Sequence, residues 1–231
     1  MYNRAFLAVA LVAVAMPVSS LCQEQTNPWQ TRLYKSFPMS RTAKPKAKVD
    51  TRDSSEPIAA ATSVPKAVAR ANDLKKAGDY SKAILVLTSA TKAFPTSKEL
   101  YLELGNCLIH ERRLSDALLN ANAAIGKCAP TAAMFRQRAS ANYMLHDYEN
   151  TLKDLDQACK MSPPTAEDYF TKANCFSNAG NSKAVIENVG LGLKQDPKNG
   201  EAYYLRAKTY KNLNQNALAE ADFAKAMSLQ K

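Results

Sequence analysis

Apolar residues recur three and four positions apart along most of the chain from residue 64 onward, which is the period of an amphipathic α-helix. In residues 166–199, two such stretches are separated by a turn at Gly180 and closed by Pro197. Gly180 can adopt the backbone angles that a helix end requires, and Pro197 cannot continue a helix. The pattern therefore predicts two helices joined by a tight turn. Neither helix can bury its apolar stripe alone, so neighbouring helix pairs are expected.

This pattern recurs every 34 residues, without insertion or deletion, in five units. The units are 64–97, 98–131, 132–165, 166–199 and 200–231. In these units the eighth, twentieth and twenty-seventh positions hold mostly alanine or glycine, and a proline closes each of the first four units. Helix axes approach within about 8–10 Å only where the side chains at the crossing are small. We therefore expect these three positions to be the points where helices cross.

The pattern resembles the tetratricopeptide repeat, a 34-residue helix–turn–helix unit with small residues at the same three positions. A bulky fourth residue in four units strengthens the resemblance; these residues are Tyr101, Phe135, Tyr169 and Tyr203. The resemblance covers residues 64–231. It implies an all-α fold, a right-handed α-solenoid of antiparallel helix pairs, with a concave groove on its inner side.

Residues 1–22 have the layout of a secretory signal peptide, with Arg4 followed by an apolar run over residues 5–16 and then small residues. As a helix this run would rise only about 18 Å, too short for a hydrocarbon layer of about 30 Å. We therefore expect an exported protein, periplasmic or secreted, without a transmembrane span.

Two cleavage points fit this leader, one after Ser20 and one after Cys22. Cys22 raises the alternative of a lipoprotein. The recognition pattern for lipidation wants leucine three residues before the cysteine and a small residue directly before it, whereas Ser19 and Leu21 occupy those places. A lipid-anchored form is therefore not expected.

Residues 23–63 contain four prolines, a basic patch and no helical period. Such a segment buries too little apolar surface to offset the entropy lost on ordering, so it is expected to be a disordered linker. The alternative is a short docking motif, carried by the apolar side chains Trp29, Leu33, Tyr34, Phe37 and Met39.

The formal net charge is +10, from 31 basic and 21 acidic residues, and no run of five like charges occurs. Aromatic residues do not alternate with a basic stripe, so no nucleic-acid partner is expected. A basic polyanion binder stays an alternative; it would bind heparin with a steep dependence on salt.

No catalytic, metal or cofactor site is expected. The only histidines, His110 and His146, are predicted to be surface residues. Four cysteines follow the leader, at positions 107, 128, 159 and 175, and their spacing lacks any Cys-x-x-Cys pair, so we expect structural thiols rather than a zinc site. The chain also lacks a phosphate-binding glycine loop and a nucleophile elbow, so an enzyme is not expected.

The groove that the resemblance implies is lined by positions 2, 5, 9, 12 and 13 of each leading helix. Position 9 holds Asn72, Asn106, Ser140, Asn174 and Lys208, and position 5 holds Val68, Leu102, Arg136, Phe170 and Tyr204. Helix propensity does not explain the recurring asparagines, although the family pattern also tolerates them. The candidate partner-binding residues are Asn72, Asn106, Arg136, Asn174, Phe170, Tyr204 and Lys208.

Three of these residues, Asn72, Asn106 and Arg136, match the carboxylate clamp of relatives that bind chaperone tails. Val68 and Ser140 stand where that motif has basic residues, so capture of a free C-terminal carboxylate is not expected. The leading hypothesis is a scaffold that holds an extended protein or peptide segment in the groove.

The alternative is an envelope assembly component that associates through the linker aromatics and the last helix. Nothing follows that helix to cover its apolar residues, so a homodimer or a frayed end is expected there. These residues are Leu218, Phe223, Met227 and Leu229.

Overall fold

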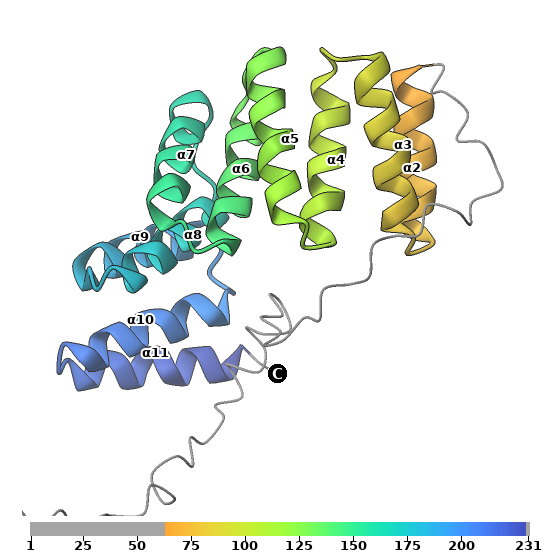
Figure 1. Ribbon diagram of the computed structural model, residues 1–231. Helices are drawn as coiled ribbons and strands as arrows, with labels where there is room; N and C mark the ends of the chain where they lie inside the picture. The colour runs from red at the N-terminus through yellow and green to blue at the C-terminus, as the bar shows by residue number, and fades with distance from the viewer. Residues whose placement is uncertain (1–62, 230–231) are drawn as a thin grey trace, which may run out of the picture. The chain divides into compact units, whose positions relative to one another are not determined.

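The computed structural model describes residues 63–229, which form ten α-helices and no strand (Figure 1). The helices are α2 (Val64–Lys76), α3 (Tyr80–Ala93), α4 (Lys98–His110), α5 (Leu114–Lys127), α6 (Ala132–Met144), α7 (Tyr148–Met161), α8 (Ala166–Asn178), α9 (Ser182–Gln195), α10 (Gly200–Asn212) and α11 (Asn216–Ser228). The predicted leader and linker lie outside the described residues. No helix in the described part is long and apolar enough to cross a membrane.

The even-numbered helices are the leading helices of the repeats, and each begins at the first residue of a predicted unit. The two helices of each pair pack against each other, and each second helix also contacts the leading helix that follows it. In addition, α4 contacts the leading helices on both sides, α2 and α6. The predicted period and the tandem helix-pair solenoid are therefore confirmed.

The fifteenth residue of every unit adopts a positive φ, which reverses the chain between the two helices. Gly78 and Gly180 do so at +79° and +70°. Arg112, His146 and Asn214 take the same position at +57°, +63° and +58°, where a side chain is strained by about 1–2 kcal/mol. His146 lies on the surface in this turn, as predicted, and its Nδ1 is 2.9 Å from the hydroxyl of Tyr148.

Side-chain caps start several helices. The carboxylates of Asp79 and Asp147 accept backbone hydrogen bonds in the first turns of α3 and α7. The backbone hydrogen bond from Lys82 lowers the pKa of Asp79, and hydrogen bonds from the side chain and the backbone of Asn150 lower the pKa of Asp147. Thr165 and Asp168 form a reciprocal capping box at the start of α8.

The small-residue positions are the buried helix contacts that the sequence predicts. Every residue at the eighth, twentieth and twenty-seventh positions is buried. The largest apolar cluster fills the first two pairs around Leu87 and Leu100, and a second cluster lies around Val185 and Val189 in α9. The core is thus a series of interfaces between neighbouring helices, as in a solenoid.

Candidate functional site

The predicted groove residues of position 9 lie on successive leading helices with their side chains at least partly exposed. Asn106 and Lys208 are exposed, and Asn72 and Asn174 are half-buried. Within residues 63–229, the carboxamides of Asn72 and Asn174 make no hydrogen bond, so both can bind a partner.

Asn106 is already part of a junction between two repeats. Its Oδ1 accepts a hydrogen bond of 2.9 Å from Nε2 of Gln137, which also donates to the carbonyl of Leu102 at 2.8 Å. Gln137 comes from α6 and lies over Gly105 of α4, where a Cβ would lie 2.1 Å from its Oε1. Gly105 therefore admits the side chain that joins α4 to α6. The amide N–H groups of Asn106 remain available to a partner.

Arg136 has a structural partner. Its guanidinium bonds Asp168 of α8 through two nitrogens, with Nε–Oδ1 of 2.9 Å and Nη2–Oδ2 of 2.8 Å. It also donates to the Ser162 hydroxyl and the Pro163 carbonyl. A ligand carboxylate would have to compete with Asp168 for this side chain. The geometry gives Arg136 the role of joining α6 to α8.

The charge state of this pair follows from its contacts. Burial alone would raise the pKa of Asp168, but the hydrogen bonds from Arg136 and Thr165 together bring it below its ordinary value of 3.8. The hydrogen bond to Asp168 raises the pKa of Arg136. Both groups are therefore ionised at neutral pH.

The two aromatic groove candidates pack within their own repeats. A Cβ added at Gly192 of α9 would lie 2.3 Å from Cε1 of Phe170, so this glycine makes room for the ring. The ring of Tyr204 meets that of Phe223 edge-on, with centroids 5.5 Å apart. Both rings are half-buried and can offer only part of their surface to a partner.

Polar links between leading helices were not expected from the sequence. Lys75 of α2 bonds Glu103 of α4, Gln137 joins α6 to α4, and Arg136 joins α6 to α8. The partners lie 28 to 35 residues apart, close to one period, and this spacing was the available signal. The spacing alone does not predict which side chains meet, because that depends on how far each repeat is displaced along its neighbour.

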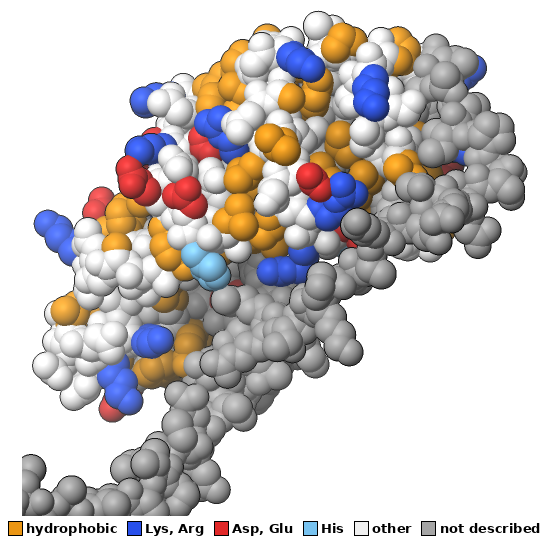
Figure 2. Space-filling view, viewed as in Figure 1, with side chains coloured by type: hydrophobic (Ala, Val, Ile, Leu, Met, Phe, Trp, Pro, Cys, Tyr) orange, Lys and Arg blue, Asp and Glu red, His pale blue; other side chains and the backbone are white. Residues whose placement is uncertain are grey.

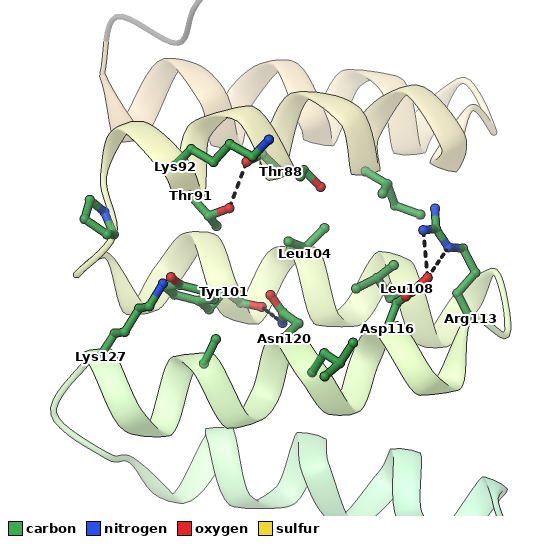
Figure 3. Close-up of a pocket in the computed structure, with 14 residues that line it drawn as sticks. Thr88, Thr91, Lys92, Tyr101, Leu104, Leu108, Arg113, Asp116, Asn120 and Lys127 are labelled. Carbon is green, nitrogen blue, oxygen red and sulfur yellow. Dashed lines mark hydrogen bonds and ion pairs between the residues drawn. The ribbon is translucent and has the colours of Figure 1, made fainter. Parts of the chain in front are cut away.

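A cleft that the sequence did not predict is bordered by the second helices α3 and α5, and α4 between them forms its floor (Figure 3). Its volume is about 510 Å³. We call it the α3–α5 cleft and define it by Ile84, Lys92, Leu104, Leu108, Leu119 and Lys127. The leucines of α4 lie between the two second helices in Figure 3.

The two ends of the α3–α5 cleft differ in charge. Arg113 and Asp116 form an ion pair at one end, with Nη2 and Oδ2 2.7 Å apart. Lys92 and Lys127 come from the last turns of α3 and α5 at the other end, and neither has an ion-pair partner in residues 63–229. Figure 2 shows one face of the molecule, on which hydrophobic side chains form several groups with basic side chains between them.

No group of three or more His, Cys, Asp or Glu side chains in the described part of the chain could hold a metal ion. The imidazole of His110 stacks on Tyr80, with centroids 3.5 Å apart. All four cysteines in this part of the chain are free, and burial raises the pKa of the Cys175 thiol to about 11.

Comparison with known proteins finds tetratricopeptide repeats in two parts of the described chain. Models described as tetratricopeptide repeat match residues 68–133 and 192–221. A crystal structure of MamA is similar at a TM-score of 0.64 and 21% identity, covering 69% of this chain and 94% of that one. MamA 41-end from Desulfovibrio magneticus RS-1 is similar at a TM-score of 0.66 and 13% identity. The match covers 71% of this chain and 93% of that one. YrrB, described as "a TPR protein with an unusual peptide-binding site", is similar at a TM-score of 0.61 and 19% identity. The match covers 71% of this chain and 85% of that one. At these identities, the structures show a shared fold.

Proposed function

The chain belongs to the tetratricopeptide-repeat family, and we propose that it is an exported scaffold that binds an extended segment of a partner protein along its leading helices. The observation that carries the proposal is the column of polar side chains at position 9. Asn72 and Asn174 have unused carboxamides, Asn106 keeps free N–H groups, and Lys208 is exposed. Carboxamides can donate to and accept from the backbone of an extended chain.

The similarity to solved structures supports this proposal only in part. YrrB, one of the proteins with a similar fold, has a peptide-binding site. The helix pairs are of the same fold here, and the uncommitted polar side chains lie on successive leading helices. Arg136 is less suited to contact a partner directly, because its donors already bond Asp168, Ser162 and Pro163.

The test is a double substitution, Asn106→Ala with Asn174→Ala, in the full chain. Proteins captured by the wild type are identified first, and capture of each by the variant is then measured. We expect the true partner to be lost from the variant while circular dichroism stays unchanged. Asn216→Ala with Gln157→Ala is the matched control, because both are exposed carboxamides on second helices. Equal capture by both variants would rule out the position 9 column.

A second candidate function is self-association or envelope assembly through the last helix. On α11, Leu218 is 51% exposed and Met227 is 65% exposed. Polar substitution of both, Leu218→Ser with Met227→Ser, should leave groove-mediated capture intact. If sedimentation shows a wild-type dimer that these changes convert to a monomer, α11 is the interface. A monomeric wild type would exclude a homodimer.

The export part of the proposal depends on residues 1–22, which lie outside the described residues. Their layout supports cleavage after Ser20 or after Cys22. Mass spectrometry of the purified mature protein would give its first residue. A mature chain that still begins at Met1 would contradict export by this route.

A further inference from the structure

We propose that the α3–α5 cleft is a second binding surface, separate from the position 9 column, which takes an acidic protein segment anchored by one aliphatic side chain. The cleft lies between the second helices of the first two repeats and over one face of α4, and no residue of the position 9 column lines it. The two surfaces therefore use different residues, and each can be removed without the other.

The apolar part of the cleft is suited to one aliphatic side chain. Ile84, Leu104 and Leu108 are each almost completely buried and form its inner wall. Leu119 stands at the rim with 69% of its surface exposed. An aliphatic side chain entering here would cover Leu119 and contact the inner wall, which removes apolar surface from water.

The charges select an acidic segment. Arg113 is neutralised by Asp116, so the excess positive charge is at the end that holds Lys92 and Lys127 (Figure 3). These two lysines come from neighbouring second helices and flank the same end of the cleft. The net charge of +10 adds attraction for an acidic partner at long range. Carboxylates placed beside the anchoring side chain would meet the two ammonium groups.

A nucleic acid fits this surface less well. Sequence-tolerant binding of single strands uses exposed aromatic rings on which bases stack. The aromatic residue that lines the α3–α5 cleft is Tyr101, which is only 4% exposed. The cleft therefore offers aliphatic contact and positive charge without a stacking surface, which favours a peptide.

Lysines at the ends of second helices have a structural reason of their own, because they complement the negative end of the helix dipole. Lys160 in α7 and Lys194 in α9 occupy equivalent last turns. Only Lys92 and Lys127 line the α3–α5 cleft. Lys160 and Lys194 are thus matched controls, with the same charge, a place in the same last turn and exposed side chains.

The test uses nuclear magnetic resonance of the isotope-labelled full chain, titrated with a peptide in which one leucine is flanked by pairs of glutamates. We expect shifts at the amides of Thr91, Asn120 and Lys127, and an affinity that falls with added salt. Lys92→Glu with Lys127→Glu should weaken binding at least tenfold, and Lys160→Glu with Lys194→Glu should leave it within twofold. Leu119→Ser should weaken it several-fold.

Two further probes separate this site from unspecific charge attraction. The same peptide with glycine in place of leucine should bind at least several-fold more weakly, and a single-stranded oligonucleotide should not shift these amides. Absence of shifts with the leucine peptide, or equal loss in both lysine pairs, would overturn the proposal. The Asn106→Ala, Asn174→Ala variant should bind this peptide as the wild type does. A negative result for the α3–α5 cleft is therefore distinguishable from a negative result for the position 9 column.

Discussion

The first two repeats are stabilised by a large apolar cluster, whereas the third and fifth repeats each contain a largely buried ion pair. In the second repeat, positions 7 and 23 hold Leu104 and Asn120, and the leucine joins the large apolar cluster. In the third and fifth repeats, the same positions hold ion pairs. Arg138 bonds Asp154 and Arg206 bonds Asp222, each with a carboxylate that is at most 10% exposed.

The comparison shows that one backbone repeat tolerates two kinds of contact between its helices. The contact of Leu104 is stabilised by burial, which has no preferred direction, and the carboxamide of Asn120 donates to the carbonyl of Tyr101. The ionic contact must be complete, because a charge buried without its partner is strongly unfavourable. The side-chain hydrogen bonds to Asp154 and Asp222 raise the pKa of Arg138 and Arg206, so both guanidinium groups stay charged. We therefore expect the two regions to respond differently to substitution.

The largest effect should come from the apolar region. Leu87 is fully buried in α3, and Leu87→Ala should lower the free energy of unfolding by about 3 kcal/mol through lost burial and a residual cavity. Amide exchange should show the loss first in α2 to α5, because each repeat is stabilised mainly by its neighbours. Equal loss of protection in α8 to α11 would show that the solenoid unfolds as one unit.

The ionic region should show a smaller loss that can be repaired. Asp222→Leu alone leaves the guanidinium of Arg206 without its carboxylate. Because the Arg206 side chain is 21% exposed, the cost should be about 2 kcal/mol, below the roughly 3–5 kcal/mol of a fully buried pair. Adding Arg206→Met should restore most of this stability, because a hydrophobic pair of similar volume removes the unpaired charge. Chemical denaturation of both variants checks this. A double variant as unstable as the single one would mean that the ion pair is itself strongly stabilising.

Two glycines in α9 test how closely the later repeats are packed. Gly192→Ala places a Cβ against the ring of Phe170 and should cost about 1–3 kcal/mol. Gly190→Ala meets nothing within 4 Å and should stabilise the helix by about 1 kcal/mol. Thermal melting of the two variants should therefore shift in opposite directions, and a shift in the same direction would contradict this packing.

The smallest effect should be a pH dependence at the α6–α8 junction. The folded-state pKa of Asp168 is lowered, so its contribution to stability is present above the unfolded pKa and is lost as pH falls through the folded value. Stability should therefore decline below about pH 4. Asp168→Asn should be less stable than the wild type at neutral pH, and the difference should shrink in acid. A constant difference across this range would show that the pair is not the cause.

The sequence alone predicted which residues lie at helix contacts, but it predicted little of how the candidate site residues are bonded. Ala71, Ala83 and Ala90 marked helix contacts because small residues repeated at three fixed positions. Arg136 was predicted to face a partner because its position in the helix points to the groove. Its actual partner, Asp168, belongs to the next repeat, and which carboxylate it reaches depends on the displacement between repeats.

The sequence by itself determined the period, the register and the points at which helices cross, since each follows from local helix geometry repeated along the chain. Only the tertiary structure decided which polar side chains join the repeats and where a cleft opens between second helices. Those outcomes depend on how far one helix pair is shifted and rotated against the next. That shift is the sum of many side-chain contacts, and no single spacing in the sequence records it.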